Sequence, residues 1–161
     1  MYDTLFLDRD GVINYKLENR YVTRASEFKF IVGAENAIKK LSKVFNRILI
    51  VTNQQGISKG IMSENNLDTV HQFMQNQLSG SEKFIEKIYF CPHLASDRCN
   101  CRKPNIGMLE QAKIDFPLID ISKSYLVGDS DTDIAAGKRF GLKTVKLDSV
   151  FTLAHWSKSI L

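Results

Sequence analysis

Residues 5–14 read LFLDRDGVIN, an apolar run that ends in two aspartates, Asp8 and Asp10, with Gly11 directly behind them. A short apolar run before such a polar cluster predicts a buried strand that ends there. Two carboxylates that share a small volume repel each other, and burying them unpaired is unfavourable. A hard divalent cation removes this conflict, so the stretch predicts a strand that carries carboxylates to a Mg²⁺ site. For one aspartate alone, a cap on the turn before Gly11 would be an equally good interpretation.

Further apolar runs alternate with segments of helical periodicity along the rest of the chain. We expect strands at residues 4–8, 47–52, 87–91, 124–129 and 143–147. We expect helices at residues 34–44, 62–78, 105–116 and 131–141. This alternation predicts an α/β fold, a Rossmann-like three-layer sandwich with a mostly parallel five-stranded central sheet and helices on both faces.

The segment 62–78 has an amphipathic pattern. Its apolar positions recur with helical spacing at Leu67, Val70, Phe73 or Met74, and Leu78. One face of this helix is therefore expected to be buried, with Ser63 as its N-cap. We interpret His71 in this helix and His155 near the C-terminus as surface or packing residues, and Trp156 as an anchor for the last residues.

The composition of the 161 residues is typical of a single globular domain, with 43% hydrophobic and 25% charged residues. The net charge of +4 is dispersed, so it favours anionic ligands only mildly and does not argue for nucleic acid. No apolar run approaches a membrane span, and the N-terminus lacks the basic region and cleavage site of a signal peptide. We expect a cytoplasmic monomer, without a membrane partner, that acts on a small phosphorylated metabolite.

Most of the chemically active residues follow predicted strands. They are Asp8 and Asp10, Thr52, Asn53 and Gln54, Cys91 and His93, and Asp129 and Asp133. Because ligands of parallel sheets bind outside the carboxyl ends of the strands, we expect these residues to meet at one edge. Asp8, Asp129 and one main-chain carbonyl would then supply oxygens to Mg²⁺.

All three cysteines fall in the segment CPHLASDRCNC, residues 91–101. An odd number of cysteines packed this tightly is a poor disulfide framework. Cys91, His93, Cys99 and Cys101 instead have the spacing and chemistry of a closed tetrahedral Zn²⁺ site. Reduced cysteines beside a lone histidine are the alternative. We expect a zinc loop at 91–101, inserted after the third strand, that fixes the following residues, Arg102 and Lys103.

Four motifs in this order resemble those of the haloacid dehalogenase superfamily of phosphohydrolases. They are DRDG at 8–11, Thr52, Lys103 and GDSDTD at 128–133. The resemblance implies that Asp8 is the nucleophile and Asp10 the general acid and base. It also implies that Thr52 and Lys103 bind the phosphoryl group, and that Asp129 holds Mg²⁺ with Asp8 and Asp10.

The expected chemistry sets the protonation states and the supporting residues. Asp8 has to be ionised and Asp10 protonated at the start, and their proximity to each other and to the metal is a plausible cause of that difference. Mg²⁺ and Lys103 neutralise the transferred group. Asp133 is expected to orient Lys103 or a metal-bound water, whereas Asp131 is better interpreted as a helix cap.

The cysteine loop also resembles two narrower groups, the D,D-heptose 1,7-bisphosphate phosphatases and the histidinol-phosphate phosphatases. Both have a very small cap, and no stretch between the motifs of this chain could form a separate cap domain. Segments at 20–33, 54–60 and 104–109 resemble the heptose enzymes, which implies removal of the 7-phosphate through an aspartyl phosphate. The five-residue spacer between His93 and Cys99 resembles the histidinol enzymes instead, so histidinol phosphate is the alternative substrate.

Substrate selectivity of such an open site has to come from loops. We expect Asn53, Gln54 and Gln55 to contact the substrate, and Arg102 to bind a second phosphate or sugar hydroxyls. A non-catalytic zinc-stabilised binding module is a further alternative, although all five catalytic side chains are present. A polynucleotide phosphatase would need a basic stripe with interleaved aromatic residues, and the sequence does not have one.

Overall fold

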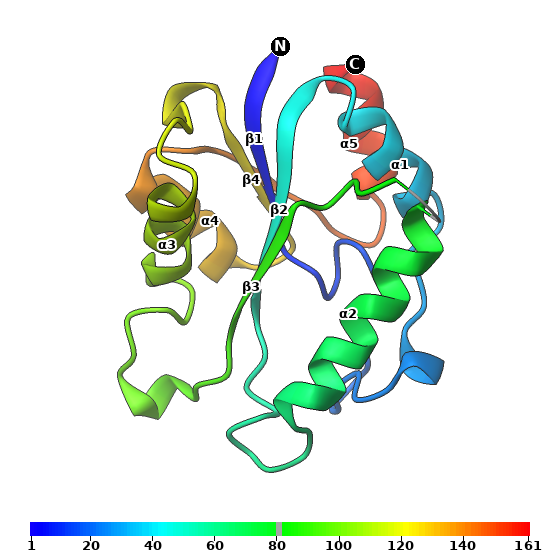
Figure 1. Cartoon of the computed structure of the whole chain (residues 1–161), viewed down its shortest axis with the longest axis vertical. Helices are drawn as coiled ribbons and strands as arrows, with labels where there is room; N and C mark the ends of the chain where they lie inside the picture. Colours follow the sequence, from blue (N-terminus) through cyan, green and yellow to red (C-terminus); the bar gives the residue numbers. More distant parts are fainter. Residues whose placement is uncertain (80–81) are drawn as a thin grey trace.

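Five parallel strands form the central sheet, in the order β3-β2-β1-β4-β5 (Figure 1). The computed structural model describes residues 1–79 and 82–161. The strands are β1 (Tyr2–Leu7), β2 (Phe45–Asn53), β3 (Lys87–Cys91), β4 (Tyr125–Gly128) and β5 (Lys143–Lys146). Every pairing between neighbouring strands is parallel. The predicted sheet is therefore confirmed, and each predicted strand has a counterpart.

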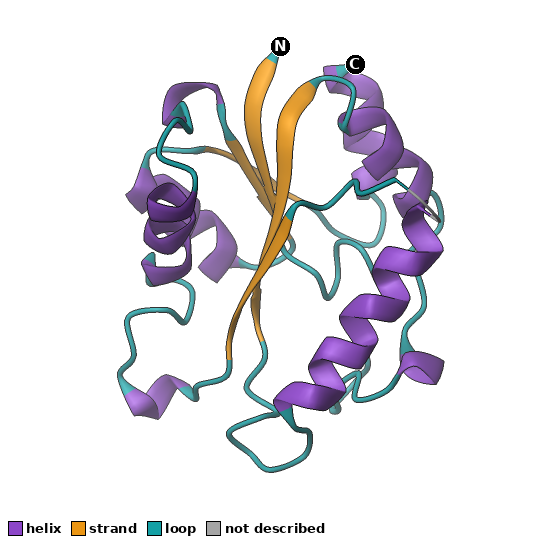
Figure 2. Ribbon diagram, viewed as in Figure 1, coloured by secondary structure: helices purple, strands orange, loops and turns teal. Residues whose placement is uncertain are grey.

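Helices cover both faces of the sheet and make three layers (Figure 2). They are α1 (Ala34–Leu41), α2 (Glu64–Ser79), α3 (Gly107–Asp115), α4 (Asp131–Phe140) and α5 (Leu153–Ile160), with 3₁₀ turns at Ala25–Glu27, Ala95–Asp97 and Ile121–Lys123. Helices α1, α2 and α5 lie on one side and α3 and α4 on the other (Figure 1). None of the helices within the described ranges is long and apolar enough to cross a membrane.

The core consists of two clusters, one on each face of the sheet. Leu5 and Leu7 of β1 belong to the cluster under α1, α2 and α5, whereas Phe6 belongs to the cluster under α3 and α4. Successive side chains of a strand point to opposite faces, so a strand buried on both sides is apolar throughout. This is why LFL precedes Asp8 without a polar residue.

Helix α2 follows its predicted pattern. Leu67, Val70, Met74 and Leu78 are buried, and Phe73 is partly buried. The Oγ of Ser63 accepts a hydrogen bond from the main-chain N–H of Asn66, whose side chain accepts one from the N–H of Ser63. The predicted N-cap is therefore confirmed.

The C-terminal helix α5 was not expected from the sequence. The main-chain N–H of Thr152 donates to Nδ1 of His155, which caps the helix where a glutamate or glutamine is usual. The Trp156 ring lies 5.6 Å from the Tyr125 ring and 6.4 Å from the Phe45 ring, between centroids. The tail is thus anchored by Trp156, as predicted.

The strand order decides where a site can form. β1 lies at the centre of the sheet between β2 and β4, so the carboxyl ends of these three strands are neighbours. Within the described residues, only a 3₁₀ turn interrupts the loop between β1 and α1, and only turns connect β2 to α2. The cap is therefore minimal, and the carboxyl edge of the sheet stays open.

Candidate active site

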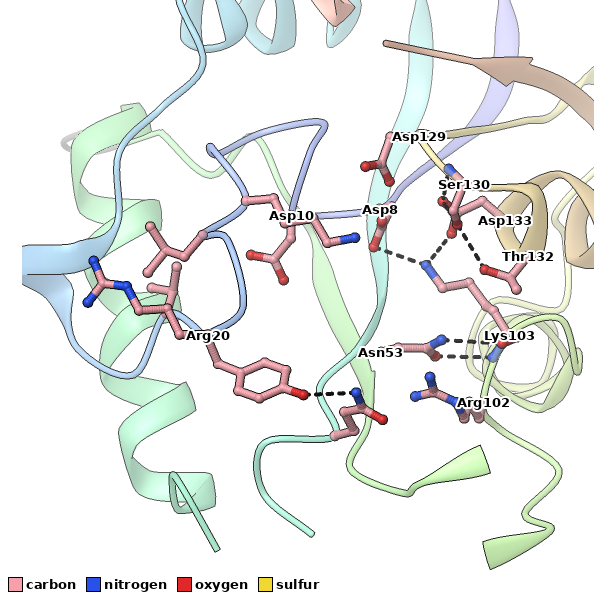
Figure 3. Close-up of a pocket in the computed structure, with 15 residues that line it drawn as sticks. Asp8, Asp10, Arg20, Asn53, Arg102, Lys103, Asp129, Ser130, Thr132 and Asp133 are labelled. Atoms are coloured by element: carbon pink, nitrogen blue, oxygen red, sulfur yellow. Dashed lines mark hydrogen bonds and ion pairs between the residues drawn. The ribbon is translucent and has the colours of Figure 1, made fainter. Parts of the chain in front are cut away.

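A cavity of about 220 Å³ lies at the carboxyl ends of the central strands (Figure 3). It is lined by these predicted residues: Asp8, Asp10, Asn53, Gln55, Arg102, Lys103, Asp129 and Asp133. Its further lining includes Lys16, Arg20 and Tyr21 from the loop after β1, and Ser130 and Thr132. Thr52 and Gln54 are buried beneath it. The structure thus brings the predicted carboxylates and the lysine together at one place.

Lys103 is the buried cation of this cavity, with only 3% of its surface exposed. Its Nζ donates to Oδ1 of Asp8 at 3.0 Å, to Oδ1 of Asp133 at 2.5 Å and to the carbonyl of Val51 at 2.8 Å. Burial lowers the pKa of Lys103, but the charges of Asp8 and Asp133 outweigh it, so the pKa is raised. The lysine is therefore charged and holds the Asp8 side chain in place.

Asp8, Asp129 and Asp133 form a group of carboxylates whose oxygens lie within 4.8 Å of one another. Burial raises the pKa of Asp8 to about 7 and, together with Asp133, also raises that of Asp129. Lys103 alone cannot balance three neighbouring negative charges. A Mg²⁺ ion held by Asp8 and Asp129 fits this donor set, since Mg²⁺ takes one or two carboxylates and keeps waters.

The backbone around this group is built for close approach. Gly11 has a left-handed backbone with φ +84°, and a Cβ there would collide with the Asp129 carboxylate. A Cβ at Gly128 would collide with the side chain of Asp133. Only glycine lets the two loops pack against these carboxylates.

Asp10 belongs to a different network. Its Oδ1 accepts from Nη2 of Arg9 and Nδ2 of Asn14, and its Oδ2 from Nε2 of Gln54, each at 2.9 Å. Gln54 also donates to Oγ1 of Thr52 at 3.0 Å. The Asp10 carboxylate is not a member of the carboxylate group beside Asp8, so its main-chain carbonyl is the oxygen it could offer to Mg²⁺.

The pKa shifts of the two aspartates run opposite to the expected protonation states. Burial raises the pKa of Asp10, but the charge of Arg9 and the hydrogen bonds from Asn14 and Gln54 outweigh it, so the pKa is lowered. The pKa of Asp8 is instead raised by burial and by neighbouring carboxylates. A cation beside Asp8 is what would reverse its shift, because an opposite charge favours the ionised form.

Three residues of this network were missed as functional residues. Arg9 is fully buried, and its Nη1 lies 3.0 Å from Nε2 of His71 on α2. In the sequence Arg9 is only the variable position between two aspartates, and His71 was expected to be a surface or packing residue. It is buried, as a packing residue would be. Asn14 follows an apolar pair and could have been noticed as a polar residue at the end of that run.

We expect the buried His71 to make the stability depend on pH. Burial and the charge of Arg9 lower its pKa from 6.5 to about 3, so the unfolded chain binds a proton near pH 6.5 that the folded chain does not. Stability from this group is complete above pH 6.5 and is lost as the pH falls, by about 1.4 kcal/mol per pH unit. Urea unfolding between about pH 5 and 6.5 should give the wild-type protein a slope more positive than that of His71→Gln, which does not titrate, by up to about 1.4 kcal/mol per pH unit, since other groups such as Asp8 contribute to both proteins alike. Equal slopes for both proteins would contradict the assignment.

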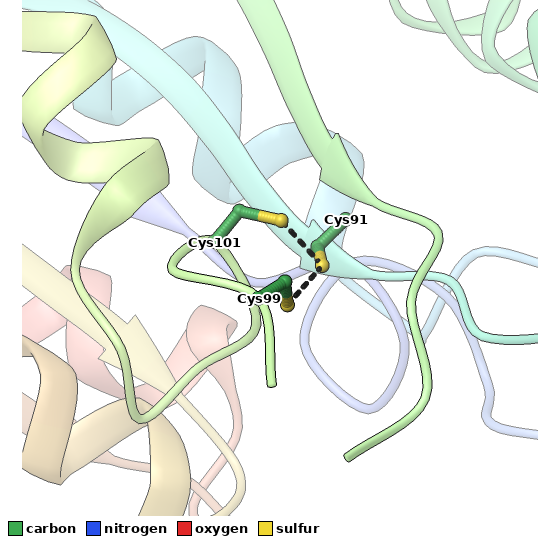
Figure 4. A group of neighbouring side chains, drawn as sticks. All are labelled: Cys91, Cys99 and Cys101. Carbon is green, nitrogen blue, oxygen red and sulfur yellow. Dashed lines mark hydrogen bonds between the residues drawn. The ribbon is translucent and has the colours of Figure 1, made fainter. Parts of the chain in front are cut away.

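The three cysteines of the predicted zinc loop come together (Figure 4). Their sulfurs lie within 4.8 Å of one another; Cys91 and Cys101 are separated by 2.7 Å, and Cys91 and Cys99 by 3.6 Å. The main-chain N–H of Arg102 donates to the sulfur of Cys99 at 3.3 Å, which ties the loop to the segment that carries Lys103. Three converging thiols without a disulfide fit a thiophilic metal such as Zn²⁺.

His93 is not a member of this sulfur group. Its side chain is 44% exposed, and Nδ1 lies 4.0 Å from the carboxylate of Asp97. The histidine follows Cys91 by two residues, so a rotation of its side chain and the loop would be needed to complete a tetrahedral site. The fourth ligand therefore stays a prediction.

The four residues that were expected to contact the substrate do not all line the cavity. Asn53 exchanges hydrogen bonds with the main chain of Lys103, so its amide positions the lysine from the cavity wall. Gln55 lines the cavity and donates to the hydroxyl of Tyr21 at 2.8 Å. Arg102 also lines it, with Nη1 donating to the carbonyl of His93 at 3.3 Å. Gln54 is 2% exposed and holds Asp10 instead of lining the cavity.

At the open edge of a parallel sheet, an aspartate is paired with a buried lysine and lies within a group of carboxylates. This arrangement defines a phosphohydrolase of the haloacid dehalogenase superfamily. A family model described as polynucleotide kinase 3 phosphatase matches residues 4–154. Since this match covers most of the chain, the chain belongs to that family.

Relatives and a solved structure agree with this class. The D-glycero-alpha-D-manno-heptose-1,7-bisphosphate 7-phosphatase of Mycobacterium tuberculosis is 40% identical over 130 residues, which cover 81% of this chain and 68% of the relative. The D-glycero-beta-D-manno-heptose-1,7-bisphosphate 7-phosphatase of Escherichia coli is 37% identical over 139 residues, which cover 82% and 71%. The D,D-heptose 1,7-bisphosphate phosphatase of B. bronchiseptica, in complex with magnesium and phosphate, matches with a TM-score of 0.88 at 25% identity and covers 98% of this chain and 97% of its own. The predicted superfamily is confirmed.

Proposed function

We propose that this protein is a Mg²⁺-dependent phosphatase that removes the 7-phosphate of D-glycero-D-manno-heptose 1,7-bisphosphate. The observation that carries the phosphatase activity is the Asp8 carboxylate, which lines the cavity beside charged Lys103 and within 4.8 Å of the carboxylate oxygens of Asp129. The substrate is supported by relatives of 37% and 40% identity that act on this sugar bisphosphate.

The reaction follows from the positions of the side chains. An oxygen of Asp8 attacks the phosphorus, the bond to the sugar oxygen breaks, and Asp10 gives that oxygen a proton. Water then attacks the phosphorus of the aspartyl phosphate and gives its proton to Asp10, which releases inorganic phosphate and restores Asp8. Lys103 neutralises the transferred group at both stages. Mg²⁺ held by Asp8 and Asp129 would supply further charge stabilisation and orient the phosphate.

The rim of the cavity supports a substrate with a second anionic group. Lys16, Arg20 and Arg102 line it together with the uncharged Gln55. A guanidinium can bind a phosphate through two parallel hydrogen bonds, and Arg102 is adjacent in sequence to the lysine that contacts Asp8. We propose that Arg102 contacts the phosphate that is not removed or the sugar hydroxyls.

The test compares phosphate release from three substrates with Mg²⁺ present. They are the heptose bisphosphate in both anomeric forms, histidinol phosphate, and an oligonucleotide with a 3′-phosphate. We expect kcat/KM to be highest for one heptose anomer, and product analysis should show that the 1-phosphate remains. A higher kcat/KM for histidinol phosphate would overturn the heptose assignment and make the five-residue spacer of the cysteine loop the better guide.

We propose that Cys91, Cys99 and Cys101, with His93 as the fourth ligand, hold a structural Zn²⁺ ion. Metal analysis of protein purified without chelators should find about one zinc per chain, and Cys99→Ser should lower both the zinc content and the melting temperature. His93→Ala should weaken zinc binding, whereas Asp97→Asn, its matched neighbour, should not. Zinc far below one per chain in the wild-type protein would contradict the site.

We propose further that residues 1–161 form one domain that works as a monomer in the cytoplasm. Three thiols kept free within eleven residues need a reducing compartment. Size-exclusion chromatography with light scattering tests the monomer, and a mass of two chains would contradict it.

A further inference from the structure

A buried arginine connects helix α2 to the proposed acid and base, Asp10. The Arg9 side chain is fully buried and does not line the catalytic cavity. Its Nη2 donates to Oδ1 of Asp10 at 2.9 Å, and its Nη1 lies 3.0 Å from Nε2 of His71. The contact between Arg9 and His71 joins residues that are 62 positions apart.

Stability alone does not explain this arginine. Burying a charged guanidinium carries a large desolvation penalty, and apolar residues of similar volume often stabilise a protein better than a buried ion pair does. Arg9 has one carboxylate partner, which is itself 23% exposed, and its Nε has no hydrogen-bond partner among the described residues. The guanidinium also lies over the Phe28 ring, with Cζ 6.0 Å from the ring centroid, but this weak cation–π contact does not offset the penalty, which favours a role in the site.

The hydrogen bond between Arg9 and His71 has only one possible direction. An arginine has five donors and no acceptor, so Nε2 of His71 must accept and the ring must be the neutral form with its proton on Nδ1. The ring therefore fixes the direction of Nη1, and the planar guanidinium then fixes Nη2, the donor to Asp10.

The two oxygens of Asp10 are held unequally. Oδ1 accepts from the charged Nη2 of Arg9 and from Asn14, whereas Oδ2 accepts, within the described part of the chain, only from the neutral amide of Gln54. The oxygen with fewer and weaker donors is the one on which a proton can sit. This assigns Oδ2 as the oxygen that exchanges a proton with the leaving group.

We propose that Arg9 and His71 are positioning residues that hold Oδ1 of Asp10, so that Oδ2 faces the leaving oxygen for proton transfer. The inference rests on the proposed function, in which Asp10 is the acid and base. Neither residue touches the substrate. Each acts through Asp10, and the direction of the Arg9 guanidinium depends on one acceptor atom of helix α2.

The test uses two substrates that differ in their need for a proton. The sugar phosphate leaves as an alkoxide and needs one, whereas p-nitrophenyl phosphate releases a stable anion and does not. His71→Met removes the acceptor at similar volume, and His71→Gln offers an oxygen near the position of Nε2. We expect His71→Met to lower kcat/KM for the sugar phosphate by about a hundredfold and for the aryl phosphate by less than about threefold, with KM little changed. His71→Gln should restore most of the loss.

Other results of these measurements would overturn the proposal. An equal loss for both substrates in His71→Met, or no rescue by His71→Gln, would overturn the positioning role, because general damage to the site does not depend on the leaving group. Arg9→Lys keeps the charge but cannot reach both partners, so it should show the same selective loss and replaces His71→Met if that variant does not fold. Asp10→Asn is the control: an equal loss of kcat/KM for both substrates would contradict the proposed role of Asp10 as the acid, since kcat/KM reports the transfer to Asp8 and not the later hydrolysis, in which Asp10 is the base for both substrates.

Discussion

Replacing Asp8 by asparagine should reduce phosphate release by about a thousandfold or more while the fold is retained. The amide lacks the charge of the nucleophile but keeps its shape, and its oxygen can still accept from Nζ of Lys103. The substitution also removes one of three crowded carboxylates, and Lys103 keeps Asp133 as a partner. We therefore expect a melting temperature equal to that of the wild-type protein or higher, measured alongside phosphate release with Mg²⁺.

Asp131→Asn is the matched control for this experiment. Asp131 begins α4 close to the site in sequence, but it is exposed and pairs with Lys146 at 2.7 Å. This variant should have wild-type activity. If Asp8→Asn kept more than about one hundredth of the activity, a carboxylate other than Asp8 would be the nucleophile.

The sheet and the positions of the carboxylates at its edge could be predicted because their signals are local. Buried parallel strands are apolar throughout, so they can be recognised from a short stretch of sequence. The residue that follows such a strand lies at the carboxyl edge of the sheet, where ligands bind. Asp8, Thr52 and Asp129 all follow this rule. The three cysteines were recognisable for a similar reason, since all lie within eleven residues, although His93, two residues after Cys91, does not join them.

The network behind Asp10 could not be predicted because its partners are distant in sequence. No feature of the neighbouring sequence distinguishes Arg9 from a surface arginine. The contact that would have drawn attention to Arg9 is made by His71 on helix α2. The titration order of Asp8 and Asp10 was missed for the same reason. It depends on how many donors each carboxylate accepts, which only the packed structure decides.

Lys103→Met should destabilise the protein by about 3–5 kcal/mol and also reduce activity by about a thousandfold. The methionine removes the cation between Asp8 and Asp133, which leaves two buried carboxylates facing each other with no opposite charge. Urea unfolding in buffer without Mg²⁺ measures this effect, since added Mg²⁺ would partly replace the missing charge. For the same reason, Mg²⁺ should stabilise Lys103→Met more than it stabilises the wild-type protein.

Adding Asp133→Asn to Lys103→Met separates the two roles of the lysine. The second substitution removes one of the uncompensated charges, so the double variant should be more stable than Lys103→Met alone, by roughly 1–3 kcal/mol. Its activity should stay low, because the charge of Lys103 no longer balances the transferred phosphoryl group. If the double variant were less stable than either single variant, Asp133 would be needed for packing and not as the counter-ion of Lys103. A gain in stability without a gain in activity would instead show that this buried charge triad is maintained for catalysis at the expense of the fold.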